Sequence, residues 1–163
     1  MRFIAHLAPF AAVAALAGAA AAQPASVVVT VSPDMDKTVK ALGQRDVQEQ
    51  IDDLTSRVQR TLASRNALDG ATIALVITDL KPNRPTIQQI NDKPGLDMMR
   101  SISIGGAAIE GTVTTASGEV HPVRSSYFST TLADVQGFTT WQDARTAFDR
   151  LARNLAEGRY VTR

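Results

Sequence analysis

The chain of 163 residues contains no cysteine. This absence excludes disulfides, zinc and iron–sulfur sites built on thiolates, and a lipid anchor on an N-terminal cysteine. A protein without disulfides must be stabilised by its hydrophobic core, and a chain of this length is large enough to bury one. The sequence therefore predicts one ordinary domain held together by packing.

An excess of charge of either sign is also absent, because 17 lysines and arginines face 16 aspartates and glutamates. Loss of Arg2 with an N-terminal signal would make the two numbers equal. A balanced chain gives no support to long-range attraction by nucleic acid or anionic lipid. We therefore expect no nucleic-acid partner.

Aromatic residues make up only 5% of the chain, and beyond the N-terminal segment all of them lie between Tyr127 and Tyr160. We expect them to form the bulky half of the core, next to a C-terminal helix. The alternative is a ligand pocket between sheet and helices. Its lining would be Tyr127, Phe128, Trp141 and Phe148.

A long hydrophobic run occurs only at the N-terminus, where residues 1–22 are typical of a secretory signal peptide. Arg2 precedes an apolar run, and the small residues Ala20 and Ala22 fit a cleavage before Gln23. The run is short for a membrane span of about 20 residues. We predict a periplasmic or secreted domain, residues 23–163, without a stable membrane anchor.

Hydrophobic periodicity predicts the elements of this domain. Strands are expected at 26–32 and 71–80, where apolar and β-branched residues dominate, and a helix at 43–64, where apolar residues recur every three or four positions. Two further strands, 101–115 and 118–132, are joined by a turn containing Gly118. A second helix covers 139–158.

These elements predict an α+β fold of order β-α-β-loop-β-β-α, with about four strands in a mixed sheet and two helices on one face. The first two strands are separated by a helix and are expected to be parallel. A β-bulge near Gly105–Gly106 would bring Ile102 and Ile104 to the face of Ile109. For the last helix we expect a capping box of Thr139 with Gln142, and Gly158 just past the end.

The segment 81–100 has three prolines and no clean hydrophobic period, although it lies between two predicted strands. Long unstructured loops are uncommon in compact domains and are often functional. Apolar residues within it predict an ordered loop, with a short strand or helical turn near 86–90. Arg84 and Arg100 could hold an anionic group or a partner's carboxylate, or form ordinary surface salt bridges.

Candidate catalytic and metal-binding residues are few. His121 is the one histidine beyond the N-terminal segment, and no nucleophile motif accompanies the neighbouring Ser125 and Ser126. Copper(I) could be held by Met98, Met99, Met35 and His121, although adjacent methionines more often cover an apolar patch. We therefore expect no catalytic residue, no metal and no cofactor.

The predicted order of elements and the glycine-containing hairpin "SISIGGAAIEGTVTTASGEV" resemble a group of small exported bacterial α/β domains. The group includes uncharacterised periplasmic proteins and auxiliary components of envelope transport and lipopolysaccharide assembly. This resemblance implies a non-enzymatic protein that binds or assists another cell-envelope component. Arg84, Arg100, Tyr127 and Trp141 are the candidate binding residues.

Two alternatives to this function remain open. One is a small-ligand carrier that uses the aromatic pocket described above. The other is a hydrolase whose carboxylates are brought together only by the fold. An open sheet edge could also be filled by a second copy of the chain, so a homodimer stays open.

Overall fold

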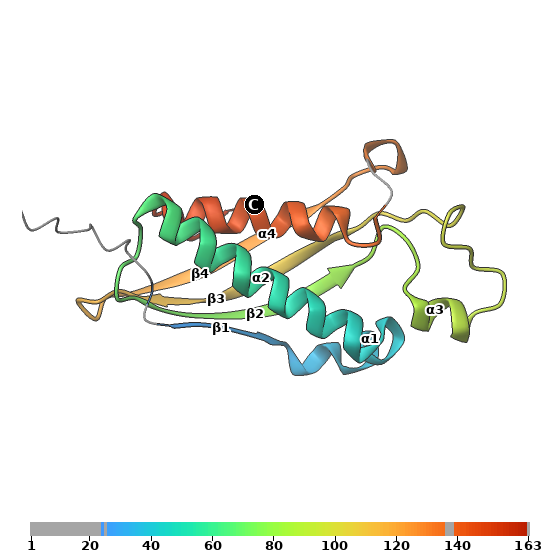
Figure 1. Cartoon of the computed structure of the whole chain (residues 1–163), viewed down its shortest axis with the longest axis horizontal. Helices are drawn as coiled ribbons and strands as arrows, with labels where there is room; N and C mark the ends of the chain where they lie inside the picture. The colour runs from blue at the N-terminus through green and yellow to red at the C-terminus, as the bar shows by residue number, and fades with distance from the viewer. Residues whose placement is uncertain (1–23, 25, 136–138, 163) are drawn as a thin grey trace, which may run out of the picture.

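A computed structural model describes residues 24, 26–135 and 139–162. Two helices lie side by side over one face of a single sheet (Figure 1). The predicted α+β class with one four-stranded mixed sheet is confirmed. In chain order the elements are β1 (Ser26–Val31), η1 (Pro33–Met35), α1 (Asp36–Leu42), α2 (Gln44–Arg65), β2 (Thr72–Lys81), α3 (Ile87–Asp92), β3 (Gly106–Thr114), β4 (Val120–Phe128), η2 (Leu132–Asp134) and α4 (Gln142–Ala156).

The strands follow the chain order β1-β2-β3-β4 across the sheet. β1 and β2 are parallel, with Ser26 opposite Thr72, as predicted from the helix between them. β2 with β3 and β3 with β4 are antiparallel, and β3 and β4 form the predicted hairpin. The helices α1 and α2 make the crossover that a parallel pair requires.

The β-bulge lies in β2, so our prediction of a bulge at Gly105–Gly106 is wrong. β3 begins at Gly106, and its pairing with β4 is regular. The register shifts between Ile77 and Asp79, which leaves Thr78 as the extra residue. This bulge returns Leu80 to the buried face of Ile77, whereas Ile102 and Ile104, which the predicted bulge would have turned to the face of Ile109, precede β3 and are exposed.

The segment after β1 contains a short helix where the sequence indicated only a turn. η1 and α1 bury Met35 and Leu42 against the core. Gly43, with φ of 95°, ends α1 and allows the chain to turn directly into α2. The predicted helix at 43–64 corresponds to α2, whose apolar face is buried as expected.

α4 presents the predicted apolar face to the sheet, and Trp141, Phe148 and Leu155 are buried. The predicted capping box is wrong. The helix begins only at Gln142, Trp141 takes the N-cap position, and the Thr139 hydroxyl contacts the Gln142 side chain instead (3.3 Å). Gly158 follows the C-cap with φ of 71°, as expected.

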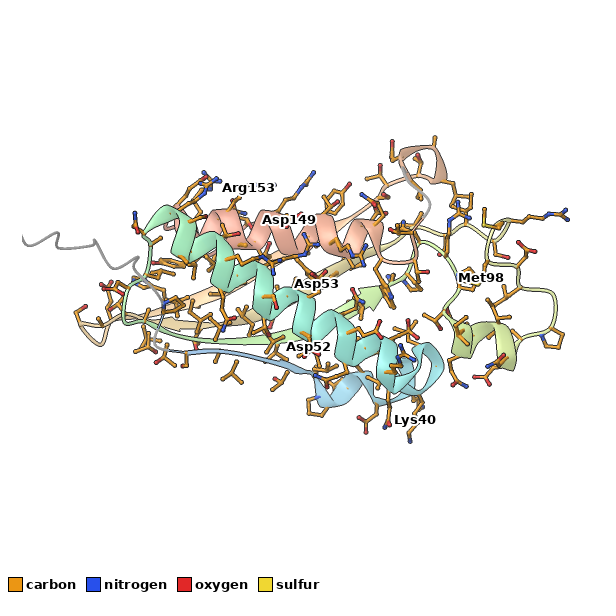
Figure 2. The ribbon with its side chains drawn as sticks, in the orientation of Figure 1. Lys40, Asp52, Asp53, Met98, Asp149 and Arg153 are labelled. Carbon is orange, nitrogen blue, oxygen red and sulfur yellow. The ribbon has the colours of Figure 1, made fainter. Side chains whose placement is uncertain are left out.

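An ion-pair cluster joins α2 to α4 on their solvent side. Arg57 donates to Asp53 of its own helix at 2.8 Å and to Asp149 of α4 at 2.6 Å; both aspartates are labelled in Figure 2. Burial by itself would lower the pKa of Arg57, but the hydrogen bonds to Asp149 and Asp53 outweigh it and raise that pKa. Arg57 therefore stays charged, and the cluster fixes the two helices relative to each other.

The two edges of the sheet differ. Along β4, Arg124 donates its N–H to Tyr160 (2.9 Å) and accepts from Thr162 (2.8 Å), so the C-terminal segment covers this edge. Along the outer side of β1, no strand of the described residues pairs.

No described helix is long and apolar enough to span a membrane. The predicted signal peptide, 1–22, lies outside the described residues.

Candidate interaction surface

The loop between β2 and β3, residues 82–105, projects past the end of the sheet and contains α3 (Figure 1). Its predicted helical turn is confirmed. Thr86 caps α3 by accepting from the Gln89 N–H at 3.2 Å, and the Gln89 side chain accepts from the Thr86 N–H at 3.0 Å. This capping box orders the middle of the loop because it satisfies two backbone donors.

Arg84 holds the two halves of this loop together. It is 6% exposed, and its guanidinium donates to the carbonyl oxygens of Met98 (3.2 Å) and Met99 (2.5 Å). Hydrogen bonds from a charged donor are among the stronger ones in proteins. Asp97 adds a local turn by accepting from the N–H groups of Met99 and Arg100. The backbone around the two methionines is therefore fixed.

A buried polar cluster anchors the loop to the rest of the molecule. The Asn83 side chain donates to Asp143 (2.5 Å) and accepts from the Asp143 N–H (2.8 Å). Ser129 donates to the same carboxylate at 2.7 Å. The Asn83 backbone bonds to Thr140 and to Ser103. These bonds join the residue that follows β2, the approach to β3, the segment after β4 and the first turn of α4 at one point.

This framework displays apolar side chains to solvent. Met98 lies in the loop past the sheet end (Figure 2). The exposed fractions of Met98, Met99, Ile102 and Ile104 are 46%, 69%, 45% and 38%. We call these four side chains the loop surface. Hydrogen bonds from Arg84 to the Met98 and Met99 carbonyls, and from the Ser103 N–H to Asn83, hold the backbone here, so the exposure of these side chains is a feature of the fold.

A groove of about 380 Å³ lies between α3 and the segment that leads into β3. Its apolar part comes from prolines, leucine and isoleucines, and its charged lining residues, Lys81 and Lys93, are both basic. The lining residues are Lys81, Pro82, Pro85, Gln89, Lys93, Leu96, Ser101, Ile102, Ser103 and Ile104. The groove therefore suits an apolar group with a negative charge next to it.

The four predicted binding residues lie in different settings. Arg84 is buried inside the loop, whereas Arg100 is exposed. Trp141 is 5% exposed, and its Nε1 has no hydrogen-bond partner among the described residues. Tyr127 is half-buried on β4, with the Arg150 guanidinium 3.9 Å from its ring centre. Only the two arginines belong to the loop.

His121 lies at the other end of the sheet, far along β4 from this loop. His121 pairs with Val113, near the end of β3 that is far from the loop. The loop joins β3 at Gly106, which pairs with Phe128 at the opposite end of β4. The His121 ring stacks on Tyr160 at 4.5 Å and lies 3.4 Å from Glu119. Met35 is buried in the core, so the structure does not bring the considered copper ligands together.

No group of three or more histidine or acidic side chains in the described part of the chain could hold a metal ion. Ser125 bonds to Thr162 at 3.1 Å on the covered edge of β4.

Sequence reasoning missed the residues that shape the loop, namely Asn83, Ser129 and Asp143. Asn83 lies in "KPNRP", which reads as an ordinary turn, and Asp143 in the first turn of a helix, where an acid is common. These side chains differ from ordinary surface side chains only because they are buried. Their burial depends on the tertiary fold, so the local sequence does not indicate it.

Comparison with known proteins identified no matching family model, no similar curated protein and no similar solved structure.

Proposed function

We propose that this chain is a non-enzymatic exported protein that binds another component of the cell envelope through the loop surface. The observation that carries this proposal is the set of four exposed apolar side chains on a backbone fixed by Arg84 and by the Asn83–Asp143 cluster. A binding surface that is ordered before it meets its partner loses less conformational entropy on binding. Rigid exposed apolar groups are thus suited to recognition.

The chemistry of the groove describes the partner. Ile102 and Ile104 provide apolar contact and Lys93 provides positive charge, whereas the other lining lysine, Lys81, is paired with Asp79 at 3.2 Å. We infer an apolar protein segment that carries a carboxylate. We infer export from residues 1–22, which are typical of a secretory signal. Because an exported protein meets the components of the cell envelope, we propose that its partner is one of them.

The test uses the purified protein as bait in envelope extracts, with bound proteins quantified by mass spectrometry. The double variant Ile102→Asp/Ile104→Asp introduces two carboxylates next to the groove and should lose the specific partner at least tenfold. Thr112→Asp, on the exposed face of β3, is the matched control and should retain it. Retention by the double variant, or equal loss by the control, would contradict the proposal.

The carrier hypothesis has less support. Of its four predicted lining residues, Phe148 is fully buried and Trp141 nearly so, both within the packed core. Native mass spectrometry of protein purified from its own cells separates the two functions. A discrete small-molecule adduct would favour the carrier, whereas a protein complex would favour the binding function.

A further inference from the structure

The outer edge of β1 has unpaired backbone groups. Ser26 donates its N–H to Ala71, just before β2, and Ser32 donates its N–H to Ile77 on β2. Because alternate residues of a strand direct their backbone groups to opposite sides, Val27, Val29 and Val31 direct theirs away from β2. None of the described residues pairs with this side.

This edge lacks the features that normally prevent pairing. Native sheets protect their edges with charged side chains, proline, bulges or a covering segment. β1 reads SVVVTV, without a charge or a proline, and its pairing with β2 is regular. Val28 is 53% exposed on the sheet face opposite the helices. Among the described residues, the C-terminal segment pairs with the middle of the β4 edge and none pairs with the outer side of β1.

A cleft of about 540 Å³ opens beside the end of β1, between the strand and the helices α1 and α2. Its apolar lining comes from Val31, Val39, Val47 and Ile51. Val31 has the same strand parity as Val29, which is buried under the helices. A strand added to β1 would therefore direct every second side chain toward the helices, and the one nearest Val31 would reach the cleft.

We propose that β1 and this cleft bind an extended segment of another protein, which adds to the sheet as a fifth strand. Backbone hydrogen bonds to Val27, Val29 and Val31 would give affinity, and the cleft would select an apolar side chain. β1 itself has no charge, and the charged residues that line the cleft, Asp36 and Arg45, have opposite signs, with Arg45 also paired with Glu49 at 3.0 Å. An uncharged segment with alternating apolar residues is the complement of this edge.

This site goes beyond the proposed function, because no residue of the cleft lines the loop groove. A second copy of the chain fits the edge less well than a separate segment. The helix-side valines of a copy's β1 already pack under that copy's own helices, and Val29 is only 8% exposed, so none of them is free to enter the cleft.

The probe is a soluble peptide of alternating threonine and valine with two lysines at each end, titrated into the purified isotope-labelled protein. Before addition, the N–H groups of Val27, Val29 and Val31 should exchange with solvent faster than those of Val28 and Thr30. Peptide should shift these three amide resonances and slow their exchange, while Thr112 stays unchanged. Saturating peptide without an effect at β1 would overturn the proposal.

Two variants test the site further. Val29→Pro removes an outward N–H that no described residue accepts, and proline is tolerated at such edge positions. Val28→Lys places a charge beside the edge with every backbone group retained. Each should weaken peptide binding at least tenfold, and Thr112→Lys should leave it unchanged.

If Val29→Pro does not fold, Val28→Lys decides the result. Unchanged binding by Val28→Lys would overturn the proposal. So would a concentration-dependent dimer of the wild type that Val28→Lys dissociates, because the edge would then belong to a second copy.

Discussion

Asn83 and Asp143 anchor loop 82–105 to the rest of the molecule. Both are at least 96% buried, and their mutual hydrogen bonds of 2.5 and 2.8 Å connect the end of β2 to the first turn of α4. A buried polar group is tolerated only while its partners remain. Removal of the Asp143 carboxylate leaves the Ser129 hydroxyl without this acceptor and leaves the Asn83 NH2 group only its longer bond to the Ser103 carbonyl, at 3.4 Å.

Asp143→Ala should therefore lower the free energy of unfolding by about 1–3 kcal/mol, because Ser129 and Asn83 lose their short bonds to this carboxylate inside the protein. Asp149→Ala is the matched control on the same helix. The Asp149 side chain is 44% exposed, and loss of its ion pair with Arg57 should cost about 0–1 kcal/mol. Urea denaturation measures both values, and equal costs would contradict the role given to the cluster.

Asp134 gives a prediction about pH. Hydrogen bonds from the Thr130 and Thr131 hydroxyls, and from the Thr131 N–H at 3.1 Å, lower the pKa of this carboxyl below its ordinary 3.8. A depressed pKa stabilises the fold above the ordinary value, and this contribution is lost as the pH falls through the lower, folded value. An NMR titration of the Thr131 amide should show a midpoint below 3.8; one at or above 3.8 would contradict these bonds.

At this scale the sequence indicates the chemistry of a side chain but not its surroundings. Arg84 and Arg100 are equivalent in the sequence, since both flank the proline-containing segment. In the structure one is buried on carbonyl oxygens and the other is exposed. Burial depends on what folds over a residue from distant parts of the chain, and local composition has no information about that.

At the scale of elements, periodicity predicted the long helices and all four strands because each buries one face. It failed where the period is interrupted. The parity mismatch near Ile102 suggested an extra residue in the third strand, whereas that residue is Thr78 in β2, and Ile102 precedes β3. The mismatch did not reflect a bulge at all, because Ile102 and Ile104 lie outside the strand and outside the core.

The bulge predicts an unusual tolerance to deletion. Removal of Thr78 would leave Ile77, Asp79 and Leu80 in regular alternation, with both apolar side chains still on the helix-covered face. Removal of Val76, in the regular part of β2, would turn the following residues to the wrong faces. We expect cooperative thermal unfolding for the first variant and loss of the folded state for the second. Equal damage would contradict this register.

At the scale of the whole molecule, the sequence was sufficient to predict the fold class, the parallel pairing of the first two strands and the layer of helices on one face of the sheet. The candidate surfaces could not be predicted to the same degree. The loop groove combines the end of β2, α3 and the approach to β3, and the edge cleft combines β1, α1 and α2. Such surfaces form only when separate elements pack together, so the proline-containing segment indicated a region but not its shape.

The most direct test of the central claim is photo-crosslinking in living cells, with a photoreactive amino acid at Met99 or at Ile102 and, as control, at Thr112. Both loop positions are exposed and belong to the loop surface, and Thr112 lies on the exposed face of β3. We predict a discrete adduct with an envelope protein from the loop positions and none from Thr112. No adduct from either loop position, or the same adduct from the control, would contradict a binding function for this loop.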